Sequence, residues 1–276
     1  MSSPSTPTPE DLFERDEFLK TCGEKMNWGD LSGKVVMDVG CGDGKSSFGI
    51  VARFPGVRHV VGVDYDRAKI EEAKLAHPHT HIEYRYADIE KRHTIVRWEN
   101  QIDKVISVYC LHQSRDQKTA FQHIYNILKN HGEAAIMFSL QSGFYDWFTD
   151  ITSHPRWRLY TEGILTQNPE SHEKEYGSDH YREIFEEVGF TVILCQEDRS
   201  TYTYSSDEEL KAAIFANCPM TQNIPEELMK EFQEDLYQAF LRHNRRDNLG
   251  RPCVWNINLI AMLKKVYPIE MTSTEV

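Results

Sequence analysis

Apolar and polar positions along the chain follow two alternating patterns. Short apolar runs predict buried strands, and between them apolar residues recur every three or four positions, as on one face of a helix. The runs predict seven strands, near 34–39, 58–63, 81–86, 103–109, 133–140, 190–197 and 254–265. The amphipathic stretches predict helices near 11–26, 44–53, 66–76, 116–129, 143–152 and 178–188. This alternation predicts an α/β fold, a doubly wound and mostly parallel seven-stranded sheet with helices on both faces.

Two late stretches depart from the alternation. Residues 153–177 show little periodicity and predict a long loop, which is uncommon unless it is functional or disordered. Residues 206–247 predict two helices, the second of which opens at Pro225. We interpret them as a helical cover over the carboxyl edge of the sheet, with a plain extension of the core as the alternative. Residues 1–10 predict a disordered tail before a single domain over 11–276.

Charge narrows the classes of partner. The formal net charge is −12, from 31 basic and 43 acidic residues, which argues against a nucleic-acid partner. The basic run 242–246 is better suited to ending a helix than to binding phosphate. No apolar run reaches membrane-spanning length, and the first residues lack the apolar core of a signal peptide. We therefore expect a cytoplasmic protein with no membrane partner.

Cysteine and histidine usage predicts no metal. The six cysteines show no C-x-x-C spacing, which is typical of separate, reduced thiols. The tract 77–81 contains three histidines but falls between a predicted helix and a predicted strand, without a nearby cysteine or carboxylate cluster. A solvated turn is the favoured interpretation over a metal site.

A glycine turn follows the first predicted strand. The sequence VVMDVGCGDG over 35–44 carries Gly40, Gly42 and Gly44 directly before a predicted helix. Glycine lets a backbone approach a ligand closely because there is no Cβ in the way. Asp64 ends the next strand, near the spacing at which an acid accepts hydrogen bonds from both ribose hydroxyls. A plain tight turn is the alternative, but the strand context and the distant acid favour a nucleoside site.

Neighbouring acidic residues narrow the class of nucleoside ligand that the site is expected to bind. The spacing G-x-G-x-G differs from the G-x-G-x-x-G of dinucleotide sites, and Asp38 stands where a carboxylate suits a cationic ligand better than a diphosphate. Asp88 follows the third strand, where it can accept a hydrogen bond from an adenine amino group while Ile89 packs on the ring. Each acid alone could also be a turn former or a cap. Their recurrence at one edge of one sheet is what favours a site.

These residues resemble a known family. Asp38–Gly44, Asp64 and Asp88–Ile89 are similar to the cofactor site of class I S-adenosylmethionine-dependent methyltransferases, whose fold is Rossmann-like. Further segments resemble the insect juvenile hormone acid methyltransferases, which methylate the carboxylate of a farnesoid acid; they are 11–16, 111–117, 120–121, 124–128 and 144–148. The resemblance covers nearly all of 11–266. It implies methyl transfer from S-adenosylmethionine to a small apolar carboxylic acid in juvenile hormone biosynthesis.

The resemblance also implies roles for single residues. The implied cofactor contacts are Arg15, Asp38, Gly40, Gly42, Asp64, Tyr65, Asp88, Ile89, Ser107 and Tyr109. The implied catalytic residues are His112 and Gln113, and the implied substrate contacts are Phe13, Gln113, Phe144 and Trp147. The chain departs from the family at two of these positions, because the family has tryptophan at 113 and glutamine at 13. Both of those family residues are associated with the carboxylate of the acid.

The acceptor determines whether a base is needed. A carboxylic acid has a pKa of about 4 to 4.5 and is already ionised at neutral pH, so orientation and removal of water are the main tasks. Neutral donors such as His112 and Gln113 suit this reaction, since fixed countercharges would favour the ground state. A hydroxyl or amine acceptor would need a base, for which His112 is the candidate. A cofactor-binding protein without acceptor activity is the remaining alternative, and the glycine spacing disfavours a nicotinamide dehydrogenase.

Overall fold

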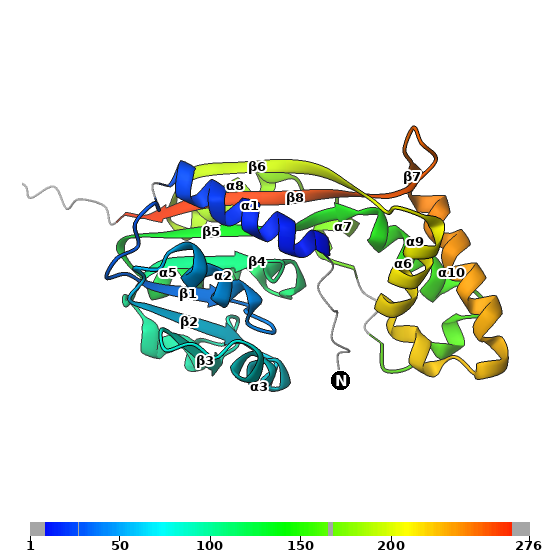
Figure 1. Ribbon diagram of the computed structural model, residues 1–276. Helices are drawn as coiled ribbons and strands as arrows, with labels where there is room; N and C mark the ends of the chain where they lie inside the picture. Colours follow the sequence, from blue (N-terminus) through cyan, green and yellow to red (C-terminus); the bar gives the residue numbers. More distant parts are fainter. Residues whose placement is uncertain (1–8, 27, 165–167, 267–276) are drawn as a thin grey trace, which may run out of the picture. The chain divides into compact units, whose positions relative to one another are not determined.

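The computed structural model describes residues 9–26, 28–164 and 168–266, with side chains from residue 17 onward (Figure 1). In this part of the chain the strands are β1 (Val35–Val39), β2 (His59–Asp64), β3 (Ile82–Tyr86), β4 (Ile102–Val108), β5 (Leu128–Ser142), β6 (Phe190–Thr203), β7 (Arg245–Arg246) and β8 (Pro252–Lys265). The α-helices are α1 (Pro9–Lys25), α2 (Lys45–Arg53), α3 (Arg67–Ala76), α4 (Arg92–Ile95), α5 (Gln117–Ile127), α6 (Gly143–Ser153), α7 (Glu170–Glu173), α8 (Ser178–Val188), α9 (Asp207–Asn217) and α10 (Met229–His243).

The strands form one mostly parallel sheet in the order β3-β2-β1-β4-β5-β8-β6. β1 pairs in parallel with β2 and β4, β2 with β3, and β4 with β5. The seven predicted strands are all present, which confirms the predicted fold class. The addition is β7, a two-residue strand antiparallel to β8 that uses the end of the predicted basic run. The other part of that run, Arg242 and His243, lies in the last turn of α10 as predicted.

The chain divides into two compact units. Among the described residues, the sheet unit comprises 14–26, 28–138, 178–196 and 259–266, and the helical unit comprises 9–13, 139–164, 168–177 and 197–258. The single domain predicted for 11–276, with a cover at about 206–247, stays a prediction. Residues 1–8 of the predicted tail 1–10 lie outside the described residues, and α1 already begins at Pro9.

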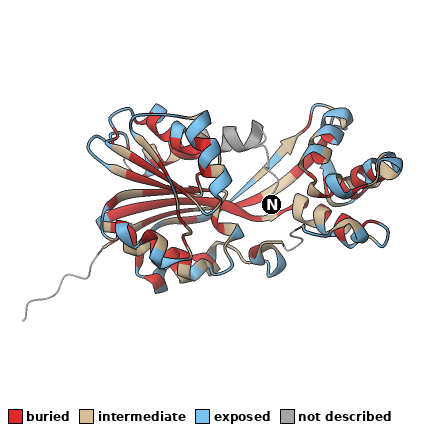
Figure 2. Cartoon of the chain, turned by 90° about the horizontal axis from the view of Figure 1, so that it is seen from below, coloured by how far each residue is buried: buried red, intermediate tan, exposed pale blue. Residues whose placement is uncertain are grey.

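The central strands of the sheet unit, β1, β2, β4 and β5, are buried on both faces (Figure 2). Successive residues of a strand point to opposite faces, so Met137 and Phe138 contact different layers. Met137 belongs to a core cluster that includes Phe18 of α1 and Ile50 of α2. Phe138 instead makes an edge-to-face contact with Tyr181 of α8, at 5.2 Å between ring centroids. Helices on both faces are what the near-continuous apolar strands require.

The helical unit is built around aromatic side chains. α10 lies beside α6 and α9 (Figure 1). Trp147, Trp157 and Phe232 are fully buried in this unit. The Trp157 ring contacts Phe232 edge to face at 5.1 Å, and its Nε1 donates to Asp235 Oδ2 at 2.8 Å. Trp157 anchors part of the stretch 153–177 in this core. The stretch 153–177 also contains a 3₁₀ turn, Arg158–Tyr160, and the helix α7, so the prediction of a plain loop was wrong at these two places.

Capping side chains and a glycine mark several helix ends. Asp66 and Asp116 accept hydrogen bonds from Ala68 N and Thr119 N, as expected of N-caps. Gly189 follows α8 with a φ of 108°. Gly132 comes shortly after the predicted helix 116–129, where a glycine often ends a helix, but it lies inside β5, which starts four residues earlier. The helix expected at Pro225 begins later, at Met229, because the extended ψ of 145° at Pro225 places that residue before a 3₁₀ turn.

Three further observations concern membranes, metals and thiols. Within 9–26, 28–164 and 168–266, none of the helices combines the length and apolar character needed to cross a bilayer. The same residues contain no group of three or more His, Cys, Asp or Glu side chains arranged to hold a metal ion. All six cysteines are free thiols.

Candidate functional site

The glycine turn after β1 is held against the end of β2. The backbone N–H groups of Gly40 and Cys41 both donate to Val63 O, at 2.8 and 3.0 Å. Gly40 has a φ of 78°, and a Cβ built on it would lie 2.2 Å from Cys110 Sγ. An alanine here would be strained in its backbone and would overlap the Cys110 side chain. Glycine is therefore required for the close approach of the loop after β4.

Asp64 joins the glycine turn to the end of β2. Its Oδ2 accepts from Gly42 N at 3.0 Å and its Oδ1 accepts from Asp66 N at 2.9 Å. Burial raises the pKa of this carboxyl, and the two backbone hydrogen bonds oppose that rise. A carboxylate has about four acceptor positions, so two remain for hydroxyl donors. This arrangement leaves room for two ribose hydroxyls, and the ribose role of Asp64 stays a prediction.

Asp38 supports the first turn of α2. It is 1% exposed, and its Oδ2 accepts from the hydroxyls of Ser46 and Ser47, both at 2.6 Å. A carboxylate near a helix N-terminus is favoured by the exposed N–H groups there. The sequence analysis did not predict these two serines as its partners. The available signal was their position in the first turn after the glycines, within reach of an acid at the end of β1.

Asp88 and Ile89 follow β3 at the same edge of the sheet. Ala87 N donates to Asp64 O at 3.0 Å, which holds the end of β3 beside Asp64. The Asp88 carboxylate accepts from Glu90 N at 3.0 Å and pairs with Lys91 Nζ at 2.7 Å. Ile89 is buried. An adenine amino group at Asp88 would share the carboxylate with the largely exposed Lys91 ammonium.

The end of β4 is tied to the end of β1. Ser107 Oγ donates to Val39 O at 2.9 Å, and Ser107 is 1% exposed. Tyr109 has a φ of 52°, an uncommon conformation for a side chain of its size, and its N–H donates to Met137 O. Burial, reinforced by Asp64 and Asp38, raises the pKa of the Cys110 thiol to about 12. Cys110 is thus neutral and fills space beside Gly40. Tyr65 is 59% exposed, next to Asp64.

A 3₁₀ turn, Leu111–Gln113, carries the predicted catalytic residues. The His112 ring stacks on Phe138, with 6.4 Å between centroids and 29° between planes. Burial lowers the pKa of His112 to about 4, so the imidazole is neutral at pH 7. Its Nδ1 is buried and has no hydrogen-bond partner among the residues that the structure describes. Gln113 Nε2 lies 3.5 Å from His112 Nε2, on the exposed side of the turn.

The remaining predicted site residues are Phe13, Arg15, Phe144 and Trp147. The side chains of Phe13 and Arg15 lie outside the described residues, so their roles stay predictions. Trp147 is fully buried in the helical unit, and its Nε1 donates to Leu236 O at 2.9 Å. Phe144 is partly buried, 4.7 Å from the Trp147 ring. Phe144 retains accessible surface, whereas Trp147 serves the core of its own unit; their predicted contacts with substrate remain untested.

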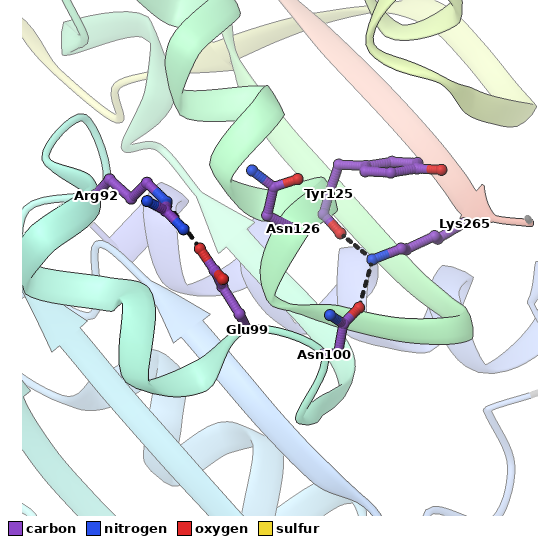
Figure 3. A pocket seen from close by; sticks show the side chains of 6 residues that line it. All are labelled: Arg92, Glu99, Asn100, Tyr125, Asn126 and Lys265. Atoms are coloured by element: carbon purple, nitrogen blue, oxygen red, sulfur yellow. Dashed lines mark hydrogen bonds and ion pairs between the residues drawn. The ribbon is translucent and has the colours of Figure 1, made fainter.

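One cavity of the sheet unit lies at the opposite edge of the sheet. It has a volume of about 290 Å³ and is lined by Arg92, Glu99, Asn100, Tyr125, Asn126 and Lys265 (Figure 3). Asn100 precedes β4 and Lys265 ends β8, whereas ligands of open α/β sheets bind beyond the carboxyl ends of the parallel strands. Lys265 is 2% exposed, and its Nζ donates to Asn100 Oδ1, Tyr125 O and Leu128 O at 2.9, 2.9 and 2.7 Å. This cavity therefore lies apart from the predicted nucleoside site.

The structure thus brings most of the predicted cofactor residues to one edge of the sheet. Asp38, Gly40, Gly42 and Asp64 are linked through the glycine turn, and Ser107 joins them through Val39. The parallel pairing of β3, β2, β1 and β4 puts Asp88 and the 3₁₀ turn at the same edge. The arrangement can hold a nucleoside and can present a neutral imidazole and an amide beside it.

Comparisons with known proteins agree with this geometry. Residues 36–132 match the family model of a methyltransferase domain. The juvenile hormone acid O-methyltransferase of Bombyx mori is 28% identical over 227 residues, which are 81% of this chain and 80% of the relative. The protein of the same name from Drosophila melanogaster is 23% identical over 232 residues, 83% and 77% of the two chains.

A solved structure extends the likeness to the fold. Phosphoethanolamine N-methyltransferase 2 of Haemonchus contortus, in complex with S-adenosyl-L-methionine, superposes with a TM-score of 0.51 at 17% identity. The match covers 92% of this chain and 53% of that chain. Two of the three names specify O-methylation and one specifies N-methylation, so the shared fold does not by itself select the acceptor.

Proposed function

Since the chain carries an S-adenosylmethionine-dependent methyltransferase domain of class I, we propose that it transfers the methyl group to the carboxylate of a small apolar acid. A farnesoid acid, as in juvenile hormone biosynthesis, is the substrate class we infer. The names of the two insect relatives support that class. The observation that carries the proposal is the state of His112 at the end of β4.

His112 is suited to bind an anion without competing for its charge. An imidazole with a pKa of about 4 is neutral at physiological pH. The Gln113 amide nitrogen has only protons to offer, so its contact with His112 Nε2 favours the tautomer that carries its proton on Nδ1. The buried Nδ1–H is then a neutral donor, and leaving such a donor without an acceptor costs about 1 to 3 kcal/mol. A carboxylate oxygen would satisfy it.

The same property disfavours acceptors that must lose a proton. Alcohols and protonated amines need a base, and catalytic bases work best with a pKa near the operating pH. His112, with a pKa of about 4, is a weak base for that purpose. A carboxylate is already ionised and needs none. Carboxyl methylation is therefore the reaction that this residue supports best.

Different residues of the predicted cofactor site would bind different parts of the cofactor. Asp64 would accept hydrogen bonds from the ribose hydroxyls, and Asp88 and Ile89 would contact the adenine. The glycine turn after β1, which contains Gly40, would contact the rest of the nucleoside. Asp38 would present negative charge toward a cationic group. S-adenosylmethionine, when bound, supplies a methyl group attached to positively charged sulfur. The chain contributes orientation and exclusion of water, and well-oriented reactants can gain on the order of 7 kcal/mol or more.

Purified full-length protein tests the proposal. It would be incubated with S-adenosylmethionine and farnesoic acid, and in parallel with panels of alcohols and amines, with methylated product detected by mass spectrometry. We expect a methyl ester from the acid and no product from the panels. Methylation of alcohols or amines alone would contradict the proposal. Binding of S-adenosylhomocysteine without product from any acceptor would indicate a cofactor-binding protein instead.

A variant pair ties the activity to the 3₁₀ turn. Gln113→Ala removes the amide beside His112, and we expect turnover to fall about tenfold, equivalent to about 1.4 kcal/mol, while calorimetry shows unchanged cofactor affinity. Gln122→Ala on the exposed face of α5 is the control and should retain full turnover. Equal loss of turnover and cofactor affinity in Gln113→Ala would instead assign this residue a structural role.

A further inference from the structure

We infer that Tyr181 is a positioning residue, which sets the placement of the His112 turn through Gln117 and Phe138. Tyr181 lies on α8, far in sequence from the glycine turn and from β4, and it is fully buried. Its hydroxyl bonds to Gln117 and its ring contacts Phe121, Phe138, His180 and Phe185, which lie outside the set of predicted cofactor residues. This inference rests on the proposed function insofar as His112 contacts the acceptor.

A polar route runs from the Tyr181 hydroxyl to the turn. Tyr181 Oη donates to Gln117 Oε1 at 2.9 Å, and Gln117 Nε2 donates to Leu111 O at 2.9 Å. Leu111 is the first residue of the 3₁₀ turn and is fully buried. Because a carbonyl can only accept, the amide nitrogen of Gln117 must face Leu111. The amide oxygen is thereby turned toward Tyr181, whose hydroxyl must donate.

An apolar route runs from the Tyr181 ring to the same turn. The ring meets Phe138 edge to face, with 5.2 Å between centroids and 78° between planes. Phe138 in turn stacks on the His112 ring. Such aromatic pairs have preferred geometries, so movement of one ring is transmitted to the next. Tyr181 thus holds the backbone of the turn through its hydroxyl and supports the His112 ring through its own ring.

The surroundings make Gln117 a firm support. It is the first residue of α5, and the preceding Asp116 caps that helix through Thr119 N at 2.9 Å. Asp116 N also donates to Glu90 Oε1 at 2.8 Å, which ties the start of α5 to the segment after β3. With these anchors fixed, the remaining freedom of the Gln117 amide is its rotation. The Tyr181 hydroxyl removes that freedom.

Tyr181→Phe tests the polar route with little change in volume. We expect turnover of the acid to fall roughly tenfold or more, since small misplacements of reacting groups are costly. The affinity for S-adenosylhomocysteine and the KM for S-adenosylmethionine should stay within about twofold, because no cofactor contact is lost. Tyr125→Phe, which removes a hydroxyl from a tyrosine on α5, is the matched control and should leave turnover unchanged.

A spectroscopic readout keeps the test independent of the acceptor. The His112 imidazole would be titrated by nitrogen-15 NMR in the full-length protein, with its signals assigned by their loss in His112→Gln. In Tyr181→Phe we expect shifted ring resonances and a pKa that moves upward from about 4 toward the ordinary value, because the turn becomes more exposed. Tyr125→Phe should match the wild type.

The outcomes separate this inference from the proposed function. Unchanged His112 resonances in Tyr181→Phe, or the same change in Tyr125→Phe, would overturn the positioning role whether or not an acid is methylated. A shifted His112 signal without turnover of any acid would uphold it and count against the proposed substrate. Gln117→Leu and the double variant with Tyr181→Phe should lose equal turnover, because both changes act through the Leu111 carbonyl.

Discussion

The sheet unit and the helical unit hold their predicted functional side chains in different ways. In the sheet unit, Asp64 and Gly42 are joined by a direct hydrogen bond between a carboxylate and a backbone N–H. In the helical unit, Trp147 and Phe144 are held mainly by contacts among aromatic rings. Backbone hydrogen bonds fix positions to within tenths of an ångström, whereas aromatic cores accept other rings of similar volume. The predicted cofactor residues are therefore more constrained in position than the predicted substrate contacts.

Gly40→Ala should have the largest effect. The new Cβ would overlap Cys110 Sγ at 2.2 Å in a left-handed backbone, so binding of S-adenosylhomocysteine should fall at least about a hundredfold. Gly33→Ala is the matched control, because Gly33 has a similar φ of 74° and no atom within 4 Å of the added Cβ. Calorimetry on both variants checks this. Equal loss in the two would assign the effect to the backbone conformation alone.

Asp64→Ala should weaken binding of S-adenosylhomocysteine by about 1 to 3 kcal/mol, through loss of charged hydrogen bonds to the ribose. Asp103→Ala is the control, since Asp103 also accepts from a backbone N–H, that of Val35, but at the amino end of β4. The affinity of Asp103→Ala for S-adenosylhomocysteine should equal that of the wild type. Unchanged affinity in Asp64→Ala would show that Asp64 does not bind the cofactor.

Trp147→Phe examines the other unit. Loss of ring volume and of the hydrogen bond to Leu236 O should lower the free energy of unfolding by about 1 to 3 kcal/mol. Hydrogen exchange should accelerate in α6 and α10, while cofactor affinity stays within about twofold. Trp28→Phe makes the same change in the sheet unit, where Trp28 Nε1 donates to Glu133 Oε2 at 2.7 Å. A loss of cofactor affinity in Trp147→Phe would show that the two regions are less separable than expected.

The pH dependence of binding is the mildest effect. Burial raises the pKa of Asp64, and ribose hydroxyls bind its ionised form, so affinity should be flat above that pKa and fall at most about tenfold per pH unit below it. The free energy of unfolding of the unliganded protein depends on pH in the opposite direction. The raised pKa of Asp64 stabilises the fold at low pH, and this contribution is lost as pH rises. Calorimetric titrations across pH check both. Asp64→Asn should abolish the acid limb, and a persisting limb would assign it to another group.

The sequence predicts which strand ends meet at one edge of the sheet, because the determinants of that arrangement are local. The glycines, Asp38, Asp64 and Asp88 stand at strand ends, and parallel pairing brings such ends to one edge whatever the rest of the chain does. A short spacing rule is enough to find them.

Contacts between distant segments could not be read in this way. Tyr181 reaches Gln117 only because α8 packs beside α5. The Cys110 side chain meets Gly40 only because β4 pairs with β1. Both contacts depend on side-chain packing between elements, for which the sequence has no fixed spacing. The two departures at Gln113 and Phe13 are of the same kind, since their consequences depend on what surrounds them.

The buried ammonium of Lys265 has a consequence for chemical labelling. Its three protons are all directed at oxygen atoms within 3 Å, so the nitrogen has no lone pair available to attack an acylating reagent while Lys265 stays buried. Acylating reagents should modify the exposed lysines, such as Lys91 and Lys118, long before they reach Lys265. The rate at which Lys265 is acylated would therefore measure how often the sheet unit opens locally at the edge opposite the predicted cofactor site.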